Sequence, residues 1–290
     1  SSEPGVNYQM YLGASAIGAP VMGSGASVDF GEVFVVGTYS AVATNAATGC
    51  SSPMSGSATV GVSTPPVAYN VTGGGSYCAG GAGINVGLSN SATGISYTLY
   101  RGTSAVGVPL VGTGTSLSFG LQTVAGSYSV RATNSAGCAT GMTGTATVIV
   151  NPVPASFAVT GGGSYCPGAG GVNIGLTGSG IGISYQLYIG STPVGSAITG
   201  TGAVLAMGTY TTVGTYSAVA TASVSGCTTN MSGTASVSQY TLPSVYSMTG
   251  GGNYCSGGAG VTVGLNGSQS GVSYTLYRGA SVVGTYAGTG

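Results

Sequence analysis

The chain has 290 residues and no net charge, and charged side chains make up only 2% of it, against about a quarter in ordinary soluble domains. Three arginines without any lysine cannot supply the basic surface that nucleic acids or acidic membranes require, and no apolar run is long enough for membrane insertion. A hydrophobic fraction of 42% argues against disorder, and zero net charge leaves little repulsion between copies.

Short segments in which apolar and other residues alternate follow one another along the chain. They include residues 84–88 (INVGL), 95–100 (ISYTLY), 128–133 (YSVRAT) and 145–150 (TATVIV). This two-residue period, with Gly, Ser and Thr between the segments, predicts short, half-buried β-strands joined by turns. No stretch has apolar residues at helical spacing over three turns. The expected fold class is therefore all-β.

Four landmarks recur in a fixed order with a period of about 88 residues. They are a Tyr-Cys pair after a glycine run, a Tyr-x-x-Tyr segment, an aromatic strand such as GTYSAVATN, and a Gly-Cys pair. The Tyr-Cys pairs contain Cys78, Cys166 and Cys255, and the Gly-Cys pairs contain Cys50, Cys138 and Cys227. This period is too long for one coil of a solenoid and fits a small independent domain.

Proline-containing junctions at 63–70, 151–157 and 240–246 divide the chain. We expect four repeats: a partial first repeat at 1–64 that lacks its first strands, full second and third repeats at 65–152 and 153–241, and a partial fourth repeat at 242–290 that lacks its last strands. About seven short strands in each full repeat predict a tandem array of immunoglobulin-like β-sandwich domains.

The aromatic strand sharpens this prediction. Strand F of an immunoglobulin domain carries Tyr-x-Cys, and its tyrosine forms the tyrosine corner. Here the tyrosines are Tyr39, Tyr128 and Tyr216, and the cysteine positions are occupied by Ala41, Val130 and Ala218. The position of the usual core tryptophan falls on Met10, Leu99, Leu187 and Leu276. We therefore expect an aliphatic core, with the cysteines in loops.

The order Cys-x-Gly, Y-x-[LM]-Y, G-[ST]-Y-[ST]-x-x-A-T, Gly-Cys and A-x-V resembles the Ig-like repeat domains of large secreted surface proteins of the Bacteroidota. The resemblance covers the whole chain. It implies a secreted, cell-surface location and a role in an adhesin or a fibre-like surface protein.

Few residues that carry chemistry are present, and none forms a recognisable site. A phosphate-binding P-loop needs a lysine, and zinc sites need grouped Cys or His ligands, but the chain has no lysine or histidine and its cysteines are isolated. Three acidic residues are too few for calcium, and no base is available to activate a serine or threonine. We expect Asp29 and Glu32 to be solvated turn residues. The expectation is no enzyme activity, no catalytic residue, no metal and no cofactor.

Disulfide bonds remain as a role for the six cysteines, and they suit an exported protein. Periodicity allows three pairing patterns. They are pairs within a repeat (Cys78–Cys138, Cys166–Cys227), pairs across neighbours (Cys50–Cys78, Cys138–Cys166, Cys227–Cys255), and pairs from one repeat to the next (Cys78–Cys227).

Strand direction disfavours one of these pairing patterns but does not decide among them. In an immunoglobulin sandwich a cysteine before strand B and one after strand F lie at opposite ends, about 20 Å apart, whereas a disulfide needs Cα atoms within about 7 Å. That geometry disfavours the bond within a repeat, but an error of one strand in the placement would restore it. All three patterns stay open, and free thiols are the remaining alternative.

The TGGG runs have a simpler interpretation than a ligand site. Glycine is needed where a chain turns tightly or packs closely. The tyrosines beside the cysteines, Tyr77, Tyr165 and Tyr254, combine an apolar face with a polar tip and are our candidates for junction or contact residues.

The sequence favours a non-enzymatic extracellular structural protein that forms or contributes to a surface filament. The alternative is the stalk of a cell-surface adhesin that presents a separate binding domain. The expected partner is the protein itself, through unshielded sheet edges, and surface proteins or glycans are further candidates.

Overall fold

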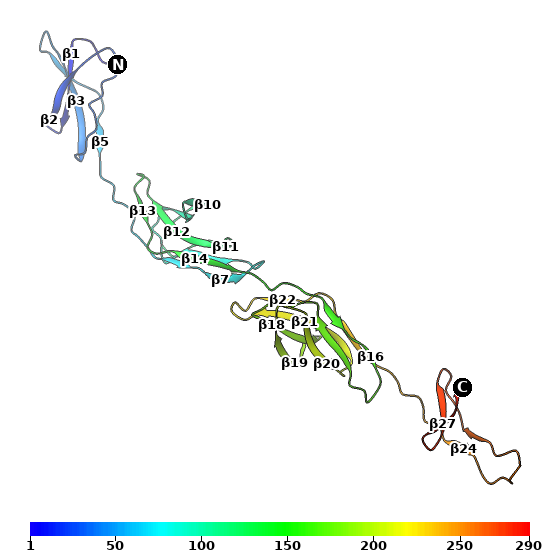
Figure 1. The fold of residues 1–290 in the computed structure, drawn as a ribbon. Helices are drawn as coiled ribbons and strands as arrows, with labels where there is room; N and C mark the ends of the chain where they lie inside the picture. Colours follow the sequence, from blue (N-terminus) through cyan, green and yellow to red (C-terminus); the bar gives the residue numbers. More distant parts are fainter. The chain divides into compact units, whose positions relative to one another are not determined.

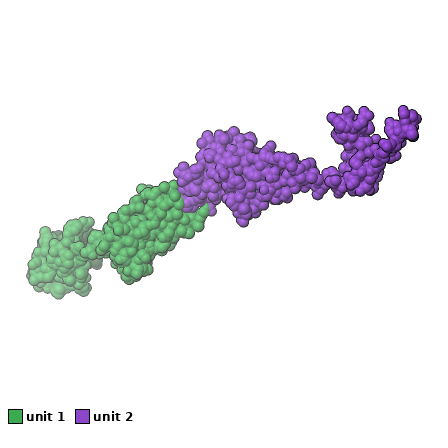
Figure 2. All heavy atoms as spheres, turned by 90° about the horizontal axis from the view of Figure 1, so that it is seen from below, with its two compact units in different colours: residues 1–76, 81–150 green, residues 77–80, 151–290 purple.

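The computed structural model describes residues 1–290 and consists of 27 β-strands joined by turns and loops (Figure 1). It contains no helix that is long and apolar enough to cross a membrane. The chain forms two compact units, residues 1–76 with 81–150, and residues 77–80 with 151–290 (Figure 2).

The third repeat, in the second unit, is a sandwich of two sheets. One sheet contains β15 (Val159–Gly161), β17 (Val172–Leu176) and β20 (Leu205–Tyr210). The other contains, in spatial order, β16 (Gly163–Tyr165), β23 (Ala235–Gln239), β21 (Gly214–Ala222), β18 (Ile183–Ile189) and β19 (Thr192–Thr199), with β22 (Thr228–Asn230) on β21. Alternate residues of both sheets form the core, which includes the buried side chains of Ile174, Leu176, Tyr185, Leu187 and Tyr216.

The second repeat has the same strand order. One sheet contains β11 (Leu117–Gln122), β8 (Ile84–Leu88) and β6 (Val71–Gly73). The other contains β10 (Ser104–Val111), β9 (Ser96–Arg101), β12 (Gly126–Thr133), β14 (Ala146–Asn151) and β7 (Gly75–Cys78), with β13 (Ala139–Gly141) on β12. The prediction of an all-β, immunoglobulin-like tandem array is confirmed.

The first and fourth repeats contain parts of the same sandwich. The first has one sheet, built from β1 (Val6–Leu12), β2 (Ser15–Met22), β3 (Gly37–Asn45), β4 (Ser51–Pro53) and β5 (Ala58–Val60). The fourth has two strand pairs, β24 (Met248–Gly250) with β25 (Val263–Leu265) and β26 (Ser273–Arg278) with β27 (Ser281–Ala287).

The TGGG run moves one strand from the first sheet of the sandwich to the second. In the third repeat β15 pairs with β17, and two residues later β16 pairs in parallel with β23. Gly161, Gly162 and Gly163 make this switch with φ values of +87°, +83° and +128°. A Cβ atom on Gly162 would lie 2.6 Å from the carbonyl oxygen of Ser236. Only glycine tolerates both this conformation and this close approach.

The tyrosines of the aromatic strands behave as the sequence predicts. Each phenol donates a hydrogen bond to the carbonyl oxygen four residues earlier: Tyr39 to Val35 at 2.7 Å, Tyr128 to Val124 at 2.8 Å and Tyr216 to Thr212 at 2.8 Å. These are tyrosine corners. The positions of the missing tryptophan are also apolar core positions, with Met10, Leu99 and Leu187 buried.

The glycine switch can be tested with the variant Gly162→Ala. We expect a loss of roughly 2 kcal/mol in the free energy of unfolding, because a methyl group meets both a positive φ and a carbonyl oxygen. Gly170→Ala is the matched control, since a Cβ there has no atom within 4 Å and the backbone is not left-handed. Denaturant unfolding of both variants gives the comparison, and equal stability would contradict the proposed role of Gly162.

Candidate functional site: the cysteine loops

The Gly-Cys loop follows the long strand that carries the tyrosine corner, and it is closed in a similar way in three repeats, although it is one residue shorter in the second. At the end of the strand a backbone N–H donates to the cysteine carbonyl oxygen: Asn45 to Cys50 at 2.9 Å, Asn134 to Cys138 at 3.0 Å and Ala222 to Cys227 at 2.8 Å. The glycine before each cysteine has a positive φ of between +71° and +83°. The loops therefore present their cysteines in equivalent positions.

The Tyr-Cys cysteine lies at the end of the strand that follows the glycine switch. In the second repeat this strand is β7, which ends at Cys78, and the N–H of Ala79 donates to the carbonyl oxygen of Asn151 at 2.8 Å. Asn151 is the last residue of β14, where the chain leaves the repeat. The switch thus places Cys78 beside the exit of its own repeat.

Cys78 and Cys227 form a disulfide bond, with Cα atoms 5.6 Å apart. Both residues belong to the second unit, because the short segment Tyr77–Gly80 groups with residues 151–290 and not with the remainder of its own repeat. Cys227 has no exposed surface. Of the three pairing patterns, the structure contains the one that runs from one repeat to the next, and it contradicts the other two for these cysteines.

The sheet topology explains why the pairs within a repeat are absent. In the third repeat β16 is parallel to β23, and β23 is antiparallel to β21. Cys166 therefore follows β16 at the end where β21 begins, whereas Cys227 follows the far end of β21. A strand of nine residues separates these ends by more than 20 Å. The geometric argument against this pairing is confirmed.

The four other cysteines are thiols in this structure. Cys50, Cys166 and Cys255 are exposed, and Cys138 is half-buried. The Sγ atom of Cys138 lies 3.5 Å from the carbonyl oxygen of Ser63, and its loop is held there by hydrogen bonds from Asn134 to Ser63 and Thr64. The loop of Cys138 thus lies against the linker that precedes its repeat. A disulfide role for these four residues stays a prediction.

The three tyrosines of the Tyr-Cys pairs have different environments. Tyr254 is 64% exposed and Tyr77 is half-buried, but Tyr165 is only 9% exposed and packs in the core of the third repeat. The phenol of Tyr165 donates a hydrogen bond to the carbonyl oxygen of Thr211. The contact role expected for Tyr165 is therefore corrected to a structural one, and Tyr254 is the exposed candidate.

Tyr210 lies next to Thr211 and packs against another tyrosine of the core. Burial raises the pKa of Tyr210, and the nearby phenol of Tyr216 raises it further. The two ring centroids are 5.2 Å apart, and the Tyr210 hydroxyl donates to the carbonyl oxygen of Met207 at 2.9 Å. This pair supports the core and faces no candidate ligand site.

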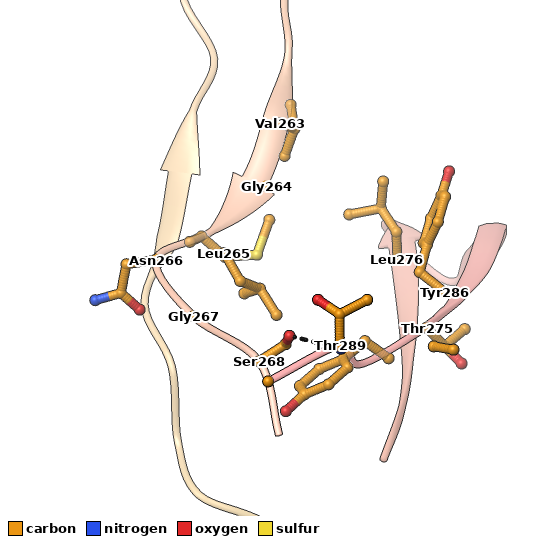
Figure 3. A pocket seen from close by; sticks show the side chains of 14 residues that line it. Val263, Gly264, Leu265, Asn266, Gly267, Ser268, Thr275, Leu276, Tyr286 and Thr289 are labelled. Atoms are coloured by element: carbon orange, nitrogen blue, oxygen red, sulfur yellow. Dashed lines mark hydrogen bonds between the residues drawn. The ribbon is translucent and has the colours of Figure 1, made fainter. Parts of the chain in front are cut away.

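A cavity of about 540 Å³ lies in the fourth repeat (Figure 3). Its walls include Leu265, Ser268, Leu276, Tyr286 and Thr289, and it has no charged side chain. Leu265 and Leu276 are the counterparts of Leu176 and Leu187, which are buried in the core of the third repeat. We interpret this cavity as the interior of a sandwich.

No three His, Cys, Asp or Glu side chains lie close enough together to hold a metal ion. The carboxylate of Asp29 accepts a hydrogen bond from the N–H of Gly31 at 2.9 Å, as in a turn. The disulfide between repeats is therefore the feature that the structure offers for function.

Comparison with known proteins supports the immunoglobulin-like fold. Residues 65–152 match the sequence model of the family described as "Ig-like domain CHU_C associated". No curated protein matches the chain.

Among solved structures, the chain is similar to a Ca²⁺-stabilized adhesin that helps an Antarctic bacterium reach out and bind ice, with 19% identity, a TM-score of 0.38, and coverage of 86% of this chain and 68% of that one. It is also similar to the insect immune protein hemolin, with 15% identity, a TM-score of 0.31, and coverage of 81% and 67%. Likenesses with TM-scores this low carry no argument about function.

Digestion with trypsin can test which cysteines are paired. Trypsin cleaves after arginine in this chain, which has only Arg101, Arg131 and Arg278. After thiol blocking and denaturation, we expect fragments 1–101 and 132–278 to remain joined until a reductant is added. Cys138→Ser should leave them joined, and Cys227→Ser should separate them. A Cys138→Ser chain that separates without reductant would show that Cys78 pairs with Cys138 instead.

The corrected role of Tyr165 gives a second test. Tyr165→Phe removes the hydrogen bond to the Thr211 carbonyl oxygen, so we expect a loss of about 1 kcal/mol in the stability of the third repeat. Tyr254→Phe is the control at the equivalent, exposed position and should leave stability unchanged. Denaturant unfolding with tyrosine fluorescence measures both, and a neutral Tyr165→Phe result would contradict the structural role.

Proposed function

We propose that this chain is a non-enzymatic, extracellular structural protein whose four repeats, at 1–64, 65–152, 153–241 and 242–290, form or contribute to a surface filament. The observation that carries the proposal is the Cys78–Cys227 bond, which joins two consecutive repeats covalently. A bond of this kind adds no chemistry at a site. It strengthens a chain of domains, and such bonds persist in oxidising environments outside the cytosol.

The composition supports the same role. The chain has zero net charge and a charged fraction of 2%. Attraction between copies therefore depends very little on the salt concentration. Exposed apolar side chains are available for such contacts, including Val108 in the second repeat and Ile181 and Val204 in the third. The bacterial surface setting, in the Bacteroidota or elsewhere, is proposed from the sequence resemblance and from the Ig-like family match of the second repeat.

Pairing between sheet edges supports filament formation less than the sequence led us to expect. The outer strands β2, β10 and β19 each contain a proline, at Pro20, Pro109 and Pro193. Each also pairs with its neighbour through an irregular register. Prolines and bulges blunt an edge against further strand pairing. We therefore expect contacts between copies to use side chains on the sheet faces.

Electron microscopy of the purified protein, free of cells and matrix, tests the proposal. Uniform filaments with a regular axial repeat are the expected result. Separate, flexible strings of domains would instead identify the chain as the stalk of an adhesin, whose binding function resides in another domain.

The salt dependence of such filaments is a separate prediction. Because the chain has almost no charge, filaments should persist unchanged between low salt and molar NaCl, as measured by sedimentation. Dissolution across this range would show that ionic contacts hold the copies together and would refute the charge-independent association proposed here.

A further inference from the structure

The disulfide bond encloses a long part of the chain. Cys78 and Cys227 are 149 residues apart in sequence. The enclosed segment contains the strands from β8 to β14 of the second repeat, the linker between the repeats, and the strands from β15 to β21 of the third. Only β6 and β7 of the second repeat and β22 and β23 of the third lie outside this loop.

We propose that the Cys78–Cys227 bond is a covalent bypass, which keeps the chain continuous and transmits tension past the enclosed linker and repeats. The inference rests on the structural role proposed above, because a bypass matters in a chain that is pulled or attacked by proteases. Tension that enters along β7 reaches Cys78, crosses to Cys227 and leaves along β22 and β23, so residues 79–226 are relieved of it.

The bypass depends on which two cysteines are joined. Bonds within each repeat, such as Cys78–Cys138 and Cys166–Cys227, would leave residues 139–165 in the path of the tension and open to separation by one cut. The observed bond instead spans this interval completely. The residues protected in this way include the linker between the two repeats.

The linker contains exposed coil, although Pro154 is buried. Residues 152–157 form no strand, and Pro152, Val153 and Ala155 are exposed. Exposed coil is the preferred site of proteolytic cleavage, whereas the paired strands on either side resist it. A cut at this place would divide the chain if the two repeats were joined by backbone alone.

A single engineered cleavage site tests the bypass. Ala155→Arg places a trypsin site in exposed coil, while Arg101, Arg131 and Arg278 lie in strands β9, β12 and β26. After brief digestion of the folded protein and thiol blocking, we expect the cut chain to migrate as one species without reductant and as two species with it. The unmodified chain, digested in parallel, shows any cleavage at other sites.

Two double variants exclude other bonds across the cut. Ala155→Arg with Cys138→Ser should still migrate as one species, because Cys138–Cys166 is not the bond that holds the parts together. Ala155→Arg with Cys227→Ser should separate without reductant. Separation of the Ala155→Arg, Cys138→Ser chain without reductant would overturn the proposal. This result does not depend on filament formation, so it distinguishes failure of the bypass from failure of the proposed function.

Force spectroscopy measures the transmission of tension directly. The oxidised chain, held at both ends and fully unfolded, should be shorter than the Cys227→Ser chain by roughly 500 Å, which is the extended length of the enclosed residues. Cys138→Ser should keep the shorter length. Equal lengths for the oxidised parent and Cys227→Ser would overturn the proposal.

Discussion

The arrangement of the second and third repeats depends on the glycine switch that lets one stretch of chain join both sheets. In the third repeat the chain pairs with β17 as β15 and, two residues later, pairs with β23 as β16. It passes a carbonyl oxygen closely between the two strands. A side chain at Gly162 would strain this passage. In the second repeat the equivalent switch brings Cys78 next to Asn151, at the end where the chain leaves the repeat. The glycine run therefore helps to place Cys78 at the end of the repeat where it bonds to Cys227.

The local features of the fold could be predicted from the sequence, whereas features that join distant segments could not. The period of two identified strands, and the tyrosine two positions before Ala41, Val130 or Ala218 identified the tyrosine corner, whose hydrogen bond spans only four residues. The glycine run could be interpreted as a tight turn. That it transfers a strand between sheets depends on β23, more than 70 residues later, and no local pattern reports that pairing.

The candidate site shows the same limit. The repeat period reduced the possible pairings of the six cysteines to three patterns, and strand direction disfavoured one of them. Choosing among them required knowing at which end of the sandwich each cysteine lies. Tyr165 was misassigned for a similar reason. Its hydrogen-bond acceptor, the Thr211 carbonyl oxygen, is 46 residues away, and the glycine run before it and the cysteine after it also flank the exposed Tyr254.

A bond between repeats also changes how they unfold. In the chain-entropy description, closing a loop of 149 residues lowers the entropy of the unfolded chain by an amount equivalent to about 5 kcal/mol. That full constraint applies only when both enclosed repeats are unfolded, because a folded repeat shortens the flexible loop. Each repeat on its own gains less, since loop entropy changes slowly with length. A bond within each repeat would stabilise the two sandwiches separately. The observed bond between repeats instead makes the stability of each sandwich depend on whether the other is folded.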